Sequence, residues 1–144
     1  MQGLMEAWAP RLLSVMRIMF GLLFLEHGTS KILGFPPPAQ ASELVILSLH
    51  GMSGLLELVG GVLLTLGLFS QPVAFVLSGE MAFAYFLAHA PESFFPLLNH
   101  GDGAILYCFG FLYLAAAGGG PWSLDRYLQS GKPRAMAATR SAAD

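Results

Sequence analysis

Acidic and basic side chains occur within stretches of this chain that are otherwise strongly apolar. Glu26, His27 and Lys31 lie in the sequence FLEHGTSKILGF, directly after the apolar run LLSVMRIMFGLL. Glu57 and Glu80 interrupt two later apolar stretches. Such groups are costly in an apolar medium unless they face one another or a ligand. Carboxyl, imidazole and ammonium groups held together can move protons and bind a ligand, so these residues are the first candidates for a functional site.

The composition indicates a membrane protein. Of the 144 residues, 55% are hydrophobic and 11% are charged, and the mean hydropathy is +0.62. A soluble domain usually carries about 25% charged residues. The formal net charge of −2 and the lack of a basic arm argue against nucleic acid as a partner. Cys108 is alone, so the chain has neither an intrachain disulfide nor a CxxC pair.

Four apolar stretches are long enough to form membrane helices, since a span needs roughly 20 residues. These helices would position the polar groups. Proline- and glycine-rich breaks separate them. The sequence therefore predicts an all-α fold, an integral membrane four-helix bundle. One membrane domain covers residues 1–131, and residues 132–144 are expected to be a disordered tail. The predicted spans are 12–33, 51–69, 73–90 and 103–117.

The distribution of basic residues predicts the orientation. Arg11 and Arg17 lie at the start of the first span, and four of the seven basic residues follow the last span. The remaining one is Lys31. Four spans return both termini to the same side, so we expect both termini in the cytoplasm and the loops 34–50 and 91–101 outside. This topology predicts a multi-pass protein of a bacterial-type plasma (inner) membrane.

Polar groups from all four helices are expected to gather in the outer half of the bundle. At about 1.5 Å per helical residue, Glu26 and Glu57 lie outward of their span centres, and Glu80 lies near the middle of its span. Full ionisation would leave excess negative charge there, so at least one carboxyl is expected to carry a proton at pH 7. The candidate roles are catalytic proton transfer for Glu57, Glu80 and Glu26, ligand binding for His27, Lys31, Asp102 and His100, and polar or close-packing structural roles for Arg17, Gly28, Gly54 and Gly61.

Small residues accompany the candidate carboxylate on the second span. Gly54, Glu57 and Gly61 share one helical stripe, and the two glycines would let a neighbouring helix approach the carboxylate closely. On the first span, Arg17 and Lys31 belong to a second seam at spacings of three and four residues.

Four stretches, read in order, resemble the DoxX family of small four-helix membrane proteins, between Arg17 and Leu128. NHGDGAILY is similar to the family's N-G-G-E start of the fourth helix, and GGGPWSLDRYL resembles its G-x-G-x-x-S-L-D ending. Asp102 stands where the family usually has Glu, and His100 where it has Gly. The first-helix pattern R…G…HG..K is matched at Arg17, Gly21, His27, Gly28 and Lys31, and the second-helix pattern E-x-x-G-G…L-G-L at Glu57, Gly60, Gly61 and Gly67.

The resemblance implies a protein associated with membrane redox complexes, because the family is related to the membrane subunits of thiosulfate:quinone oxidoreductase. On this interpretation the chain is a membrane subunit that binds a quinone-like ligand in its outer polar pocket. It would be part of an oxidoreductase without having an electron-transfer cofactor of its own. A protein partner would then carry the redox centre. The chain could also form a homo-oligomer.

Other functions remain open at this stage. The chain could be a non-catalytic scaffold or assembly partner of a redox complex, or a small-molecule carrier. Metal or haem binding through His27, His89 and His100 is less favoured, because the sequence lacks the Glu-x-x-His pairs of bundle metal sites. A purely structural interpretation competes with all of these, in which the polar groups only hold the helices in register.

Overall fold

The computed structural model describes residues 2–38 and 45–130, and every regular element within them is helical. This confirms the predicted helical class, whereas the expected tail at 132–144 lies outside the described residues. The elements are α1 (Gln2–Leu33), α2 (Leu49–Leu66), α3 (Ser70–Ala84), the π-helix η1 (Tyr85–His89), α4 (Asp102–Ala117) and α5 (Leu124–Ser130).

Three of these helices are long and apolar enough to cross a membrane. They are α1, α2 and α3 with its continuation η1, whereas α4 is apolar but has 16 residues. At about 1.5 Å per residue, α4 spans roughly 24 Å, slightly less than a hydrocarbon core of about 30 Å. The three long helices and the shorter one together fit a membrane helical bundle. The α1 helix begins ten residues before the predicted span (2 against 12), because hydropathy marks the apolar part of a helix and not its end.

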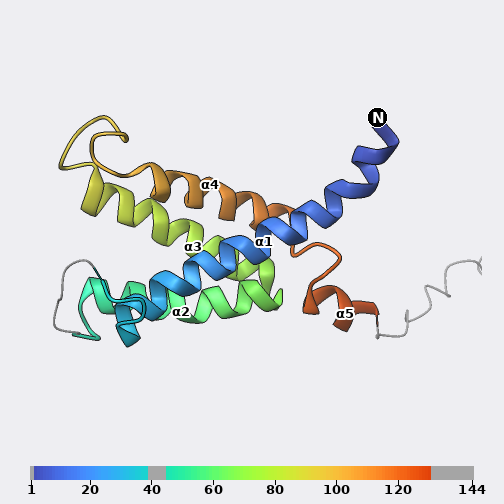
Figure 1. Cartoon of the computed structure of the whole chain (residues 1–144), viewed down its shortest axis with the longest axis horizontal. Helices are drawn as coiled ribbons and strands as arrows, with labels where there is room; N and C mark the ends of the chain where they lie inside the picture. The colour runs from blue at the N-terminus through green and yellow to red at the C-terminus, as the bar shows by residue number, and fades with distance from the viewer. Residues whose placement is uncertain (1, 39–44, 131–144) are drawn as a thin grey trace, which may run out of the picture.

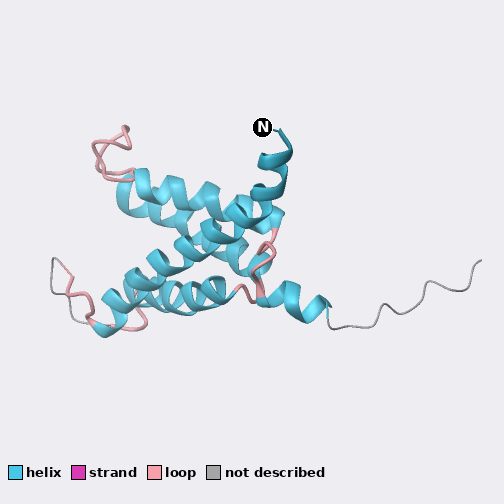
Figure 2. Cartoon of the chain, turned by 45° about the vertical axis from the view of Figure 1, so that its right-hand side comes forward, coloured by secondary structure: helices cyan, strands magenta, loops and turns pink. Residues whose placement is uncertain are grey.

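The helices α1 to α4 pack as two pairs, α1 with α2 and α3 with α4, and α2 packs against α3 to join the pairs (Figure 1). The α1–α2 and α3–α4 connections lie at one end of the bundle, which we call the loop end. The N-terminus of α1 and the short α5 lie at the other, which we call the terminal end (Figures 1 and 2). The two pairs are separated most at the loop end.

Glycines bring the backbones of α1 and α2 into direct contact. A Cβ atom on Gly28 would lie 2.4 Å from the Leu58 backbone nitrogen, and one on Gly61 would lie 2.6 Å from the Leu25 nitrogen. Neither position has room for a side chain. This close approach is the geometry that small residues allow between membrane helices. It also fixes the side chains of the first two helices relative to one another.

A small apolar core lies where the two helix pairs meet. Phe24 of α1 packs edge-on against Phe111 of α4, with ring centroids 4.8 Å apart. Edge-to-face packing of this kind adds about 0.5–1.5 kcal/mol to the burial of two rings. The buried apolar residues are Phe24, Leu64, Ala74, Leu77, Met81, Phe111 and Leu114.

Candidate functional site

Lys31 and Glu57 form an ion pair between α1 and α2 in the half of the bundle nearer the loop end. The Lys31 Nζ atom lies 2.6 Å from Glu57 Oε1 and 2.7 Å from Ser53 Oγ. Ser53 lies one helical turn before Glu57 and donates to the same carboxylate oxygen at 3.3 Å. Glu57 is only 1% exposed. Its negative charge is therefore stabilised by a charge-assisted hydrogen bond rather than by water.

Glu80 of α3 reaches the same place from the other helix pair. Its carboxyl group lies beside the Ser53 hydroxyl and within electrostatic range of Glu57 and Lys31. Both Glu80 carboxyl oxygens are buried, and neither has a well-formed hydrogen bond to any described residue; the same holds for Glu57 Oε2. We call Lys31, Ser53, Glu57 and Glu80 the acid–base cluster.

The acid–base cluster holds two carboxyl groups but one ammonium group. A buried carboxylate without a donor is far more costly than the neutral acid, and Lys31 is already paired with Glu57. The neutral form of Glu80 is therefore the form that these surroundings favour. The cluster can hold one exchangeable proton close to a fixed positive charge, which is the arrangement that proton transfer requires.

His27 and Tyr107 extend the polar region toward α4. His27 lies one turn before Lys31, and its ring centroid is 6.3 Å from that of Tyr107. His27 Nδ1 lies 3.0 Å from the Leu23 carbonyl oxygen, so this nitrogen donates along its own helix and Nε2 is left for another partner. The Tyr107 hydroxyl forms no hydrogen bond within residues 2–38 and 45–130. Both side chains can therefore offer polar atoms to a ligand.

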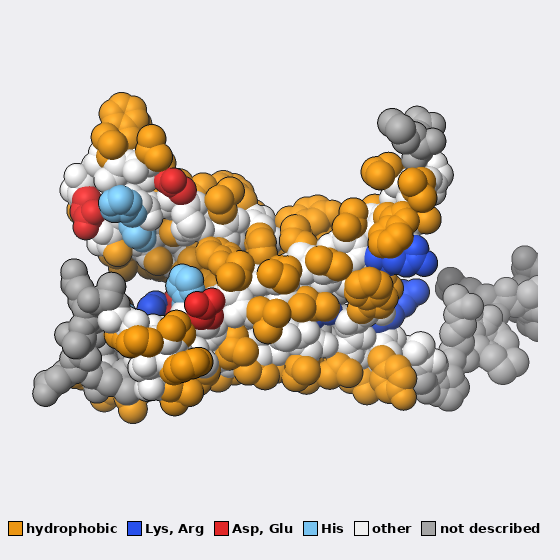
Figure 3. All heavy atoms as spheres, viewed as in Figure 1, with side chains coloured by type: hydrophobic (Ala, Val, Ile, Leu, Met, Phe, Trp, Pro, Cys, Tyr) orange, Lys and Arg blue, Asp and Glu red, His pale blue; other side chains and the backbone are white. Residues whose placement is uncertain are grey.

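The molecule is hollowed between the two helix pairs at the loop end. In Figure 3, acidic, basic and histidine side chains gather on both sides of this hollow, whereas the middle of the same face is almost entirely apolar. All four long helices contribute polar groups toward this end, through Lys31, Glu57, Glu80 and Tyr107.

Glu26, Asp102 and His100 lie apart from the acid–base cluster, and all three are exposed. In the described part of the chain, none of them forms a hydrogen bond or ion pair with the cluster. Glu26 instead lines a shallow cavity with Thr29 and Phe35 and lies within electrostatic range of Tyr107. Glu26 and Lys31 are five positions apart on the helix, which is a rotation of about 140° around α1. The structure therefore brings Glu57 and Glu80 together and directs Glu26 elsewhere.

The connection between η1 and α4 is held by its own polar contacts. The buried Asn99 side chain donates to the Ser93 carbonyl oxygen at 2.7 Å and accepts from the Gly101 backbone N–H at 2.8 Å. His89 Nδ1 lies 2.9 Å from the Asn99 carbonyl oxygen. Within the described ranges, no three His, Cys, Asp or Glu side chains are grouped so that they could hold a metal ion.

Arg17 forms a second polar centre near the terminal end. Its guanidinium is completely buried and donates to the backbone carbonyls of Leu64 and Thr65 in the last turn of α2. It also donates to Gly119 and Trp122 in the α4–α5 connection, at 2.8 Å each. One side chain thus supplies donors to carbonyls at the end of α2, where Thr65 has no helical partner, and to carbonyls of the α4–α5 connection. Arg17 ties three parts of the chain together and is not part of the acid–base cluster.

Asp125 of α5 caps the start of α3. Its two carboxylate oxygens accept hydrogen bonds from the backbone N–H groups of Phe69 and Ser70, at 2.8 Å each. Burial alone would raise the pKa of Asp125, but these hydrogen bonds and the nearby Arg17 charge outweigh it and lower the pKa below its ordinary value. The helix cap is therefore supplied from a residue that is distant in the sequence.

We expect the free energy of unfolding to fall at low pH through Asp125. The unfolded chain binds this proton at a pKa of about 3.9, whereas the native carboxyl binds it at lower pH. The stabilisation is therefore fully present above about pH 4 and is lost as the pH falls through the native pKa. Asp125→Ala should cost about 1 kcal/mol at pH 7. Thermal unfolding between pH 3 and 7 should show the two proteins converging at low pH, with the exposed Glu92→Ala as control; a constant difference would contradict this assignment.

Three contributing residues were not singled out from the sequence. Ser53 lies one turn before Glu57 on the same helix face, and this spacing of four could have indicated its contact with the carboxylate. Asp125 lies in the SLD stretch quoted for the family resemblance, but its partners are backbone amides, which have no sequence signature. For Tyr107, the sequence offered no signal of a functional role beyond its position on the predicted fourth span.

The fold and the site together define a class of protein: a small multi-pass helical membrane bundle with a buried acid–base cluster between its helices. Comparison with known sequences then identifies the family. The DoxX family profile matches residues 12–90, which is more than half of the chain, so the chain belongs to the DoxX family. It is also 39% identical over 125 residues to a protein of Haemophilus influenzae described as uncharacterized, covering 84% of this chain and 93% of that relative. No solved structure matches the chain.

Proposed function

We propose that the protein is a membrane subunit of a redox system and binds a quinone-like ligand next to the acid–base cluster. One observation carries this proposal: Glu80 is an acid with both oxygens buried and no well-formed hydrogen bond, beside the Lys31–Glu57 ion pair. A carboxyl group in these surroundings can give up a proton to a bound acceptor, and the same surroundings favour its return to the neutral acid.

The polar groups available at the hollow suit a quinone headgroup. A quinone accepts hydrogen bonds at its carbonyl oxygens, and His27 and Tyr107 can direct polar atoms toward it from α1 and α4. The aromatic rings of Phe20, Phe24 and Phe111 pack around the Tyr107 ring and fix its position. When bound, a quinone would accept two electrons and two protons to become a quinol. The chain's part would be to bind the headgroup, exclude water and supply one of the two protons from Glu80, the other coming from the aqueous side of the membrane.

The electrons must come from another protein. The chain has one cysteine, so it cannot provide the four thiolates of an iron–sulfur cluster. A partner can be accommodated at the α3–α4 connection, where Phe94 is 88% exposed and Leu97 is 77% exposed. This exposed apolar loop also favours the second candidate function, a scaffold that assembles a redox complex without binding a small molecule.

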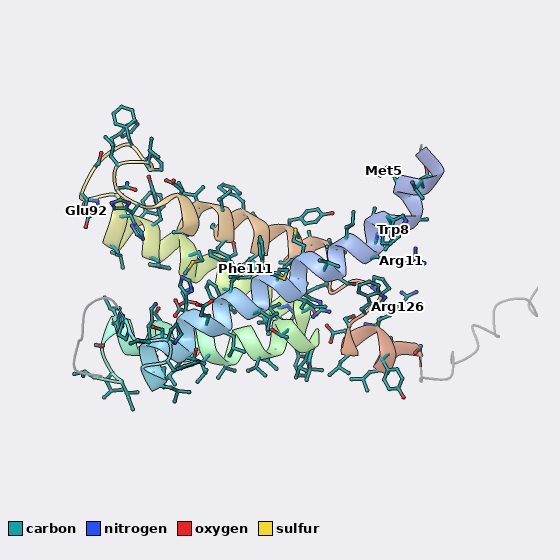
Figure 4. The ribbon with its side chains drawn as sticks, viewed as in Figure 1. Met5, Trp8, Arg11, Glu92, Phe111 and Arg126 are labelled. Carbon is teal, nitrogen blue, oxygen red and sulfur yellow. The ribbon has the colours of Figure 1, made fainter. Side chains whose placement is uncertain are left out.

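The proposal includes a topology. Arg11 and Arg126 lie at the terminal end (Figure 4), and Arg17 contacts the α4–α5 connection near it. The single described basic residue toward the loop end, Lys31, is paired with Glu57. By the positive-inside rule the terminal end is cytoplasmic, so the acid–base cluster lies in the outer half of a bacterial plasma membrane.

Titration with a soluble ubiquinone or menaquinone analogue tests the proposal. The purified protein in lipid nanodiscs should bind the analogue saturably, as measured by isothermal titration calorimetry. His27→Phe and Tyr107→Phe should each weaken binding by roughly three- to tenfold, because each removes one hydrogen-bonding group. Asp102→Asn, at an exposed position apart from the cluster, serves as the control.

Two results would overturn the proposal. Wild-type protein that binds no analogue, together with a soluble protein that co-purifies with it, would favour the scaffold. Saturable binding that all three variants share would place the ligand somewhere other than the hollow.

A further inference from the structure

A cavity of about 570 Å³ lies at the terminal end of the bundle, away from the acid–base cluster. Residues Pro10 and Leu13 of α1 form one wall, and Arg126 and Gln129 of α5 form another. The α2–α3 turn and the glycine-rich residues 118–120 close it from the side of the other helix pair. Four separate parts of the chain therefore surround one space.

The cavity lies at the depth of lipid headgroups. Arg17 contacts the last turn of α2 and also Gly119, just after the end of α4. Its position along α1 therefore marks the level at which those two apolar helices end. Pro10 lies seven residues before Arg17 on α1, which is about 10 Å further along the helix axis. Exposed Trp8 and Trp122 lie near the same level, where tryptophan is enriched at membrane–water interfaces.

Among the described residues, one arginine that lines the cavity and a second one next to a lining residue have no acidic partner. Arg126 lines it, and Arg11 follows the lining residue Pro10; Figure 4 places both at the terminal end. The Arg11 guanidinium contacts its own helix and the Trp8 ring, and within residues 2–38 and 45–130 neither arginine forms an ion pair.

One lining residue is acidic, and its charge is already compensated. Both Asp125 oxygens accept backbone hydrogen bonds at the start of α3, and the buried Arg17 lies within electrostatic range. The exposed guanidinium groups of Arg126 and Arg11 therefore make the opening of the cavity attractive to anions. Guanidinium groups bind phosphate oxygens with paired hydrogen bonds.

We propose that this cavity binds the phosphodiester headgroup of an anionic phospholipid, with Arg126 and Arg11 as its contacts. The lipid's acyl chains would leave the cavity along its apolar lining, which includes Leu13, Pro72 and Ala117. The bound lipid would fill the space between α1 and α5 and support the α4–α5 connection. This inference depends on the terminal end lying at a membrane surface and is independent of the proposed quinone site.

Native mass spectrometry of the full chain in detergent tests the proposal by titration with cardiolipin, phosphatidylglycerol and phosphatidylcholine. Cardiolipin and phosphatidylglycerol should bind more tightly than phosphatidylcholine. Arg126→Gln should weaken anionic lipid binding by about fivefold, and addition of Arg11→Gln should weaken it by a similar further factor. Arg140→Gln, which removes the same charge outside the described residues, should bind like wild type.

A filling variant separates the cavity from general surface charge. Ala117→Trp places a large ring in the cavity wall without changing the charge, and it should displace the anionic lipid. Equal weakening by Arg126→Gln and Arg140→Gln would overturn the proposal in favour of non-specific attraction. Competition by millimolar inorganic phosphate would also overturn it, since the site would then take a soluble anion. If Arg126→Gln fails to fold, Arg11→Gln and Ala117→Trp still decide the question.

Discussion

Replacing Arg17 with methionine will lower the unfolding temperature of the protein by roughly 10–15 °C. The Arg17 side chain has no exposed surface and donates to four backbone carbonyls in α2 and the α4–α5 connection. Methionine fills much of the same space but leaves the carbonyls of Thr65, Gly119 and Trp122 without this donor. The carbonyl of Leu64 keeps the Gly67 backbone N–H. The loss of a buried charged donor typically costs about 3–5 kcal/mol.

Two further variants distinguish the network from the charge alone. Arg17→Lys keeps the positive charge, but an ammonium group cannot reach four carbonyls in three directions, so we expect an intermediate loss. Arg11→Met removes an exposed arginine from the same helix and should change the unfolding temperature by less than about 2 °C. Thermal unfolding followed by circular dichroism in one detergent provides the comparison. Equal effects of the Arg17 and Arg11 replacements would show that the buried network contributes little.

The helices were predictable because membrane spans have a strong compositional signal. Their number and order follow from apolar stretches separated by proline and glycine. The lower predictability of helix ends has a physical cause, which α1 illustrates: Glu6 and Arg11 end the apolar stretch but are compatible with a helix that continues outside the membrane. At the far end of α3, the chain changes to a π-helix, which sequence patterns did not indicate.

The acid–base cluster was predictable in part. Depth along the helix predicted that Glu57, Glu80 and Lys31 lie in one region, and the structure pairs Lys31 with Glu57 and places Glu80 within electrostatic range of both. Depth also grouped Glu26 with them, but direction around the helix decides contact, and Glu26 points away from the Lys31 side of α1. The positions of Asp102 and His100 depend on how the loop held by Asn99 turns, which no local pattern specifies.

Replacing Lys31 with methionine is the second change with a large expected effect. It leaves the Glu57 charge buried without its partner, which should cost about 3–5 kcal/mol and lower the unfolding temperature by roughly 10–15 °C. Adding Glu57→Gln to Lys31→Met should restore much of this loss, because removing both members of a buried pair can be nearly neutral. Additive effects of the two replacements would show that the pair is not coupled.

The same cluster predicts where the exchangeable proton is held. Glu80→Gln should leave the unfolding temperature within about 2 °C of wild type, because an amide resembles the neutral acid in shape and charge. It should also remove the carboxylic acid C=O band of a buried, protonated side chain from the infrared spectrum at pH 7. Glu57→Gln should remove that band as well, since Glu80 would then ionise and pair with Lys31. A band that persists in both variants would mean that the proton belongs to a carboxyl outside the cluster, and that Glu80 is not the proton source.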